Sequence, residues 1–280
     1  MRAREGALGR LFRNRRGGLG GVVVAAMLAA GLLAPAVAPY GYSTQSLLQR
    51  LKPPTAAHWL GTDGFGRDIL TRVLWGSRVS LQIGLLATGL AVLVGTTVGG
   101  AAGYAGGPVE SVLMRASDVF MAVPALFLIL VVVALFGASL LNTALVVGFV
   151  TWAPVARIVR GECLTLRTRE FVEAARALGA SHRRILLRHV LVNALPALIV
   201  QATLLLGQTI LIESGLSYLG LGAQPPLPSW GNMVVEGRQF VGSAWWVSTF
   251  PGVAIFVTVL GFNLFGDGLR DALDPALRSP

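Results

Sequence analysis

The sequence has little charge, one cysteine and one lysine, and each shortage excludes a class of protein. Only 13% of its 280 residues are charged, about half of the roughly 25% that soluble domains carry. Cys163 is the only cysteine, so the chain has neither an internal disulfide nor a multi-cysteine metal site. Lys52 is the only lysine and lies outside any G-x-x-x-x-G-K-[ST] phosphate-binding loop. A soluble enzyme, a disulfide-rich secreted domain and a nucleotide hydrolase of that kind are therefore excluded.

Long uncharged runs dominate what the sequence does contain. An apolar stretch of about 18 residues or more crosses ~30 Å of hydrocarbon as a helix. We therefore predict an all-α, polytopic membrane bundle of about six spans, with Gly137, Ala138 and Ser139 forming the turn between spans three and four. The predicted spans cover residues 20–38, 79–104, two stretches within 119–156, 190–212 and 244–266. This organisation divides the chain into an Arg-rich arm (1–16), a first span with a long outer loop (17–78) and a five-span core (79–280).

The first span has two interpretations. Ala36, Val37 and Ala38 resemble the end of a secretory signal that is cleaved. Pro39 follows at once and disfavours cleavage, so we expect an uncleaved anchor. Either interpretation leaves five further spans in the membrane.

Basic residues indicate the orientation of the spans. With the N-terminus inside, 17 of the basic residues fall in cytoplasmic segments and 6 in outer segments. This asymmetry is the one that the positive-inside rule describes, so we predict that both termini are cytoplasmic. The arginines flank apolar spans and are not interleaved with aromatic residues, which indicates contact with lipid headgroups rather than with nucleic acid.

The familiar catalytic motifs are absent as well. The chain contains neither a G-x-S-x-G nucleophile turn nor an H-E-x-x-H zinc helix. Asp118 and Glu213 fall at the ends of predicted spans, where we expect water or headgroups to reach them. We predict no catalytic residue, no metal site and no cofactor in this chain.

The longest predicted cytoplasmic connection, residues 157–189, contains a helix-turn-helix pattern. Apolar residues at 171, 174, 175 and 178 recur at helical spacing. Gly179 is placed to end this helix in a left-handed cap, and Ser181 to cap a second short helix over 182–189. One interpretation is a rigid hook that receives force from a soluble partner; the other is an ordinary charged loop lying on lipid headgroups.

This connection resembles a known family. Glu173, Ala174 and Ala175, followed after three residues by Gly179, are similar to the EAA loop of bacterial ABC-importer permeases. Other stretches resemble the C-type permease subunit of dipeptide, oligopeptide and nickel importers. They are H-W-L-G-T-D-G-F-G-R-D at 58–68, G-S-R-V-S-L at 76–81, S-Y-L-G-L-G-A-Q-P-P at 217–226, P-S-W-G-N at 228–232 and G-D-G-L-R-D-A-L-D-P at 266–275. Val192 departs from the family, whose members usually have proline there, and we expect a straighter helix at that point.

The resemblance implies a fold and a set of partners. The fold is the type I importer permease bundle, located in the bacterial inner membrane. The partners are a second permease, two ATPase subunits that bind ATP and Mg²⁺, an extracytoplasmic solute-binding protein and membrane lipid. The residues expected to couple to an ATPase are Glu173, Ala174, Ala175, Gly179, Ser181, Arg183 and Arg184.

Peptides are the expected substrates, with nickel or another small solute such as glutathione as the alternative. A self-sufficient secondary transporter and a membrane scaffold that transports nothing are less favoured interpretations.

Several other segments have predicted structural roles. Residues 67–74 are expected to form a short amphipathic helix along the outer interface, supported by an Asp68–Arg72 pair. The Gly- and Pro-rich stretch 214–232 is predicted to be a loop over the outer mouth, with Trp230 near the interface. The residues expected to pack helices closely or to act as hinges are Gly95, Gly99, Gly103, Pro124 and Pro196.

Overall fold

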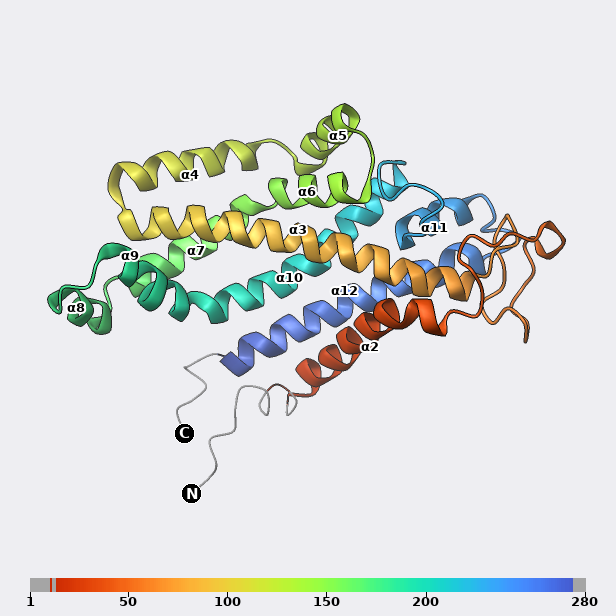
Figure 1. Cartoon of the computed structure of the whole chain (residues 1–280), viewed down its shortest axis with the longest axis horizontal. Helices are drawn as coiled ribbons and strands as arrows, with labels where there is room; N and C mark the ends of the chain where they lie inside the picture. Colours follow the sequence, from red (N-terminus) through yellow and green to blue (C-terminus); the bar gives the residue numbers. More distant parts are fainter. Residues whose placement is uncertain (1–10, 12–13, 274–280) are drawn as a thin grey trace, which may run out of the picture.

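The chain folds into an elongated bundle of helices, in agreement with the predicted all-α bundle (Figure 1). The computed structural model describes residue 11 and residues 14–273. Most of the predicted basic arm, residues 1–16, lies outside these described residues, as does the last part of the 266–275 motif. Within the described part no strand occurs apart from one isolated bridge between Thr62 and Asp68.

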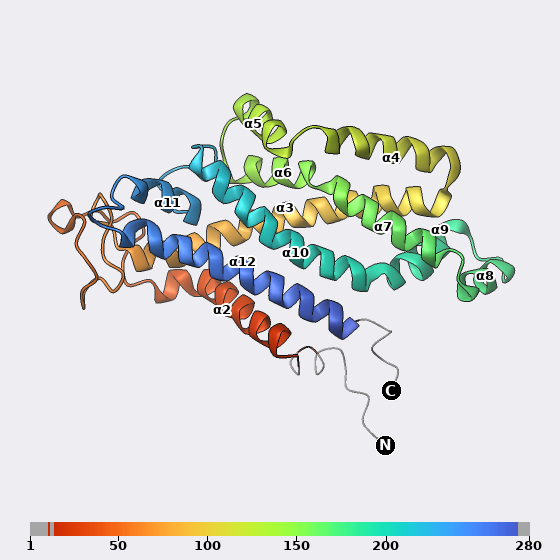
Figure 2. The same cartoon turned by 180° about the vertical axis from the view of Figure 1, so that it is seen from behind.

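Four helices are long and apolar enough to cross a membrane, and two bent pairs bring the number of spans to as many as six. The four are α2 (Arg15–Val37), α3 (Ile69–Ala105), α12 (Trp246–Leu273) and the stretch His182–Tyr218, which ends in α10 (Leu191–Tyr218). They lie side by side along the length of the molecule in both views (Figures 1 and 2).

The two bent pairs are the candidates for the remaining two spans. The first joins α4 (Gly107–Ala122) to α5 (Ala125–Phe136) at an angle of 83°, and the second joins α6 (Leu140–Val150) to α7 (Trp152–Leu166) at 42°. Pro124 lies in the first break and is the N-cap residue of α5, where its ring and its missing N–H interrupt the helix. The turn between the pairs lies at residues 137–139, as predicted.

Helix α3 begins ten residues before the predicted second span, which corrects two expectations. Residues 69–74 are not a separate interfacial helix but the first turns of α3. Asp68 caps this helix, because its Oδ2 accepts a hydrogen bond of 2.7 Å from the Thr71 N–H. Its other oxygen lies 2.9 Å from Nδ1 of His58, so the predicted pairing with Arg72 does not form.

Other boundaries also extend into segments that were predicted to be loops. Helix α7 continues to Leu166, so the connection predicted to begin at 157 begins ten residues later. The first residues of the 214–232 stretch complete α10, and Trp230 begins α11 (Trp230–Arg238). Trp230 is fully buried inside the protein, and its indole N–H donates a hydrogen bond of 3.0 Å to the Val73 carbonyl of α3.

The start of α10 is continuous with the helical turns before it. A π-helical turn, Ile185–Val190, joins α9 (His182–Arg184) to α10, so the predicted second helix of the hook is not separate from the fifth span. The backbone stays helical through Val192, and Pro196 is accommodated inside α10.

Three glycines bring α3 and α7 into close contact. A methyl group built on Gly103 would lie 2.7 Å from the Arg160 carbonyl oxygen, and one built on Gly99 would overlap the carbonyl of Ala156. At Gly95 the same position lies 2.6 Å from Cβ of Val155. Backbones approach this closely only where side chains are absent, so the spacing of these glycines determines where α7 lies along α3.

This contact predicts a position-specific effect of adding one methyl group to α3. Gly99→Ala forces α3 and α7 apart and is expected to destabilise the protein by about 1–3 kcal/mol. Gly89→Ala is the matched control, because nothing lies within 4 Å of its Cβ position and alanine favours a helix interior. Thermal unfolding in detergent should show a lower melting temperature for Gly99→Ala alone; equal shifts would contradict the glycine contact.

Candidate functional site

The hook, residues 167–184, protrudes from one end of the bundle (Figure 1). It contains α8 (Glu170–Ala177), a turn and α9. Gly179 has φ of +79° and lies in the turn that ends α8, a conformation that costs other residues about 1–2 kcal/mol. Ser181 caps α9, because its Oγ accepts a hydrogen bond of 3.4 Å from the Arg184 N–H.

The hook is anchored to the spans by an apolar core and by polar contacts. Val172 is fully buried in the same cluster as Cys163 of α7 and Ile185 of the π-helical turn. His182 Nδ1 lies 3.0 Å from the hydroxyl of Tyr104, near the end of α3. The hook is therefore held against three helices.

The outward face of the hook is partly apolar. Leu178 is 88% exposed and Phe171 is 41% exposed, although both are large hydrophobic side chains. Of the residues expected to couple to an ATPase, Glu173, Ala174, Gly179, Ser181, Arg183 and Arg184 are exposed. Ala175 is buried inside the hook and packs there instead of facing a partner.

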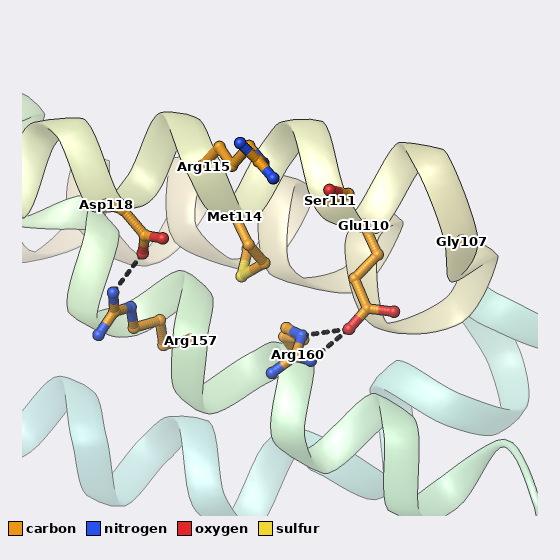
Figure 3. Close-up of a pocket in the computed structure, with 8 residues that line it drawn as sticks. All are labelled: Gly107, Glu110, Ser111, Met114, Arg115, Asp118, Arg157 and Arg160. Atoms are coloured by element: carbon orange, nitrogen blue, oxygen red, sulfur yellow. Dashed lines mark hydrogen bonds and ion pairs between the residues drawn. The ribbon is translucent and has the colours of Figure 1, made fainter.

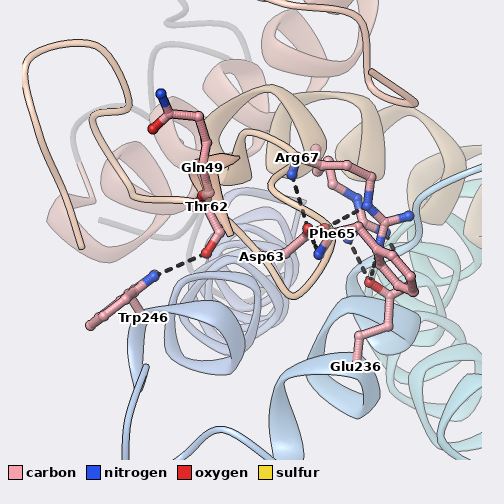
Figure 4. Close-up of polar contacts among 8 residues, drawn as sticks. Gln49, Thr62, Asp63, Phe65, Arg67, Glu236 and Trp246 are labelled. Carbon is pink, nitrogen blue, oxygen red and sulfur yellow. Dashed lines mark hydrogen bonds and ion pairs between the residues drawn. The ribbon is translucent and has the colours of Figure 1, made fainter. Parts of the chain in front are cut away.

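A buried ion network lies at the opposite end of the bundle (Figure 4). The Asp63 network consists of Asp63, Arg67, Arg72 and Glu236. Asp63 accepts hydrogen bonds from Nε of Arg67 at 2.6 Å and from Nη1 of Arg72 at 2.5 Å. Glu236 accepts from Nη2 of Arg67 and from Nη1 of Arg72, both at 2.6 Å. Two arginines thus face two carboxylates, and charges buried in this way must be paired.

The Asp63 network attaches the outer loop to α11. Asp63, Arg67 and Arg72 are almost fully buried, whereas the Glu236 side chain on α11 is 31% exposed. The indole N–H of Trp246, the first residue of α12, donates a hydrogen bond of 3.2 Å to the Thr62 carbonyl. The sequence interpretation paired Arg72 with Asp68 in an interfacial helix and missed this network. The spacing of Asp63 and Arg67, four residues apart, was the one signal for it.

A second buried polar cluster surrounds Glu213 in α10. The Glu213 cluster consists of Ser80, Glu213, Ser217 and Ser229. The carboxylate is fully buried and accepts from Ser217 Oγ at 2.7 Å and from Ser80 Oγ at 3.3 Å. Ser217 Oγ is also 3.2 Å from Oγ of Ser229, the N-cap residue of α11. The expectation that water or headgroups reach Glu213 is wrong, because α3, α10 and the start of α11 enclose it.

Asp118 is the other acid that was expected at the end of a span. Asp118 is exposed and pairs with Arg157. Within residue 11 and residues 14–273, no group of three or more His, Cys, Asp or Glu side chains is placed to hold a metal ion.

Comparison with known proteins decides the family. Residues 91–279 match the family described as the binding-protein-dependent transport system inner membrane component. Residues 5–54 match the N-terminal transmembrane domain of oligopeptide transport permease C. The chain belongs to this family of inner membrane components.

Relatives align with nearly the whole chain. A dipeptide transport system permease protein of Alkalihalophilus pseudofirmus is 42% identical over 98% of this chain and 90% of its own length. A glutathione transport system permease protein of Pectobacterium atrosepticum is 41% identical, with coverage of 96% and 90%. An oligopeptide transport system permease protein of Bacillus subtilis is 39% identical, with coverage of 97% and 89%. The chain is therefore a helical permease of the inner membrane, as the resemblance implied.

The Asp63 network predicts unequal effects for two ion-paired aspartates of this permease. Asp63→Ala leaves Arg67 and Arg72 buried with one carboxylate between them, and is expected to cost about 3 kcal/mol or more. Asp118→Ala is the control, because Asp118 is 57% exposed and exposed pairs contribute about 1 kcal/mol at most. Melting temperatures in detergent should fall only for Asp63→Ala, and a similar fall for both would show that burial does not matter here.

Proposed function

We propose that this chain is a permease subunit of an ATP-driven importer of short peptides. It would pair with a second permease to form the translocation path, receive substrate from an extracytoplasmic binding protein and be driven by two ATPase subunits. Family membership supports the transport role, and the relatives described above are permease proteins of dipeptide, glutathione and oligopeptide transport systems. Peptides are therefore favoured over nickel as the substrate, because no observation supports nickel.

The structure of the hook is the observation that supports coupling to an ATPase. It protrudes beyond the spans, its outward face exposes Leu178 and Phe171, and its inner side is fixed in an apolar core. An exposed apolar surface rimmed by charged residues is typical of a protein–protein contact. A fixed protrusion of this kind transmits the movement of a partner to the spans instead of absorbing it.

Force from an ATPase would reach the spans along three connections. Helix α9 continues through the π-helical turn into α10, α7 leads directly into the hook, and His182 contacts Tyr104 of α3. Glu173, Arg183 and Arg184 supply exposed charges around the apolar centre of the hook. ATP and Mg²⁺ would be bound by the ATPase subunits and not by this chain.

The orientation follows from the hook and from the distribution of basic residues. With the hook in the cytoplasm, both termini are cytoplasmic and the Asp63 network lies outside, where the binding protein would dock. The rival secondary transporter would need an ionisable residue near the middle of the membrane. Glu213 does not serve this purpose, because it lies near the outer end of α10 and is enclosed by hydroxyl groups.

The coupling role predicts that one leucine on the hook is required for capture of the ATPase. Leu178→Glu places a charge in the proposed apolar contact and should abolish co-purification of ATPase subunits with the tagged permease. Leu48→Glu is the control, because Leu48 is 90% exposed at the opposite end. A detergent pull-down followed by mass spectrometry measures both, and recovery of the second permease shows that each variant is folded. ATPase recovery with Leu178→Glu at the wild-type level would refute the contact.

A further inference from the structure

A charged groove lies between α4 and α7, two helices that belong to membrane spans (Figure 3). Its volume is about 590 Å³. Arg160 pairs with Glu110 through a hydrogen bond of 2.6 Å from Nε, and Arg157 pairs with Asp118. Arg115 also lines the groove and has no ion-pair partner among the described residues. Three positive and two negative side chains thus lie in one hollow of an otherwise charge-poor chain.

The glycine contacts show how far along the bundle this groove extends. Gly103 lies against Arg160, near the end of α3, and Gly99 lies against Ala156, the neighbour of Arg157. Gly99 precedes the last residue of α3 by six positions, or about 9 Å at 1.5 Å per residue. The two ion pairs therefore lie one after the other along the spans. The Arg160–Glu110 pair is nearer the hook end, and the Arg157–Asp118 pair lies farther inward.

The backbone on the same face is interrupted. Both helices of the groove belong to broken spans, bent by 83° at Pro124 and by 42° near Thr151. Residues 121–127, across the first break, are all exposed in the chain by itself. Irregular backbone at membrane depth is tolerated where protein covers it or where it lines a water-filled cavity. Ionisable side chains in spans follow the same rule, so two independent features disfavour lipid on this face.

We infer that the broken-span face lines the solute path and that the α4/α7 groove is a polar subsite for the charged ends of a peptide at the hook side of the path. The inference rests on the proposed importer function and goes beyond it by naming the path wall. Arg115 is available for the peptide carboxylate, since its guanidinium is not engaged by an acid of the described chain. Asp118 is exposed, and its Oδ2, the oxygen that does not pair with Arg157, offers an acceptor for the peptide ammonium group. A groove with charges of both signs matches a zwitterionic solute.

Cysteine labelling tests whether water reaches the groove. The chain has a single cysteine, Cys163, which is buried and gives a low background. Ser111→Cys and Met114→Cys place a thiol in the groove. Val22→Cys is the control, because Val22 is 61% exposed on α2 and lies seven residues from the start of its helix, as Met114 does.

The assay uses the full transporter complex in inside-out vesicles and a membrane-impermeant maleimide. We expect both groove thiols to react at least about tenfold faster than the thiol at position 22, and di-alanine to slow their labelling. Groove thiols that react no faster than the control would show that lipid or the second permease covers this face, and would overturn the inference.

Uptake measurements test the proposed contact with the peptide carboxylate. Arg115→Gln should raise the KM for di-alanine roughly tenfold, the effect of losing one charge-assisted hydrogen bond, and leave the KM for its C-terminal amide unchanged. An equal change for both peptides would contradict the role of Arg115. Wild-type complex that transports neither peptide would refute the proposed substrate, whereas the labelling result still decides whether the groove faces water.

Discussion

The close approach of α3 and α7 at Gly95, Gly99 and Gly103 is the contact on which the rest of the bundle depends. Helices in a bilayer gain little from apolar burial against one another, so close packing and hydrogen bonds must hold them together. Helix α3 packs against α2, α6, α7 and α10, and α7 leads directly into the hook. The glycine contact therefore fixes where the hook lies relative to α3 and to the helices that pack against α3. At the hook end, where α7 leaves the spans, Arg167 donates a hydrogen bond of 3.1 Å to the Gly103 carbonyl and holds α7 to α3 there as well.

At the other end of the bundle, buried polar groups rather than glycine contacts hold the helices together. The Asp63 network holds α11 to the loop before α3, and the Glu213 cluster holds the N-terminus of α11 to α3 and α10. Asp63 and Glu213 are buried, so each is satisfied by hydrogen-bonding groups of the protein rather than by water. The short α11 is thus attached at both of its ends to separate parts of the chain. This arrangement explains how a Gly- and Pro-rich segment with little helix of its own adopts a defined position.

Local sequence features predicted the parts of the structure that local interactions determine. Uncharged runs located the spans, the turn at Gly137 and the interruption at Pro124 followed from backbone chemistry, and the motif around Gly179 led to the hook. The errors occurred where the partner is distant in the sequence. Arg72 is an outward charge in a helical pattern, yet its second carboxylate, Glu236, comes 164 residues later. Glu213 lies at the end of an apolar run, and only the fold encloses it with Ser80 and Ser229. Helix ends were placed too far inward because apolar runs end before the hydrogen-bonded helices do.

The uninterrupted helical stretch His182–Tyr218 has a mechanical consequence. It joins α9, the last part of the hook, to the opposite end of the bundle in 37 residues with no loop between them. At 1.5 Å per residue this is a lever of about 55 Å, and a tilt of about 5° at one end displaces the other by roughly 5 Å. Ser217 and Glu213 lie at that far end, bound to the cap of α11. A small rotation of the hook is thus amplified into a displacement larger than a hydrogen bond is long, applied to the segment where the Glu213 cluster meets the outer loops.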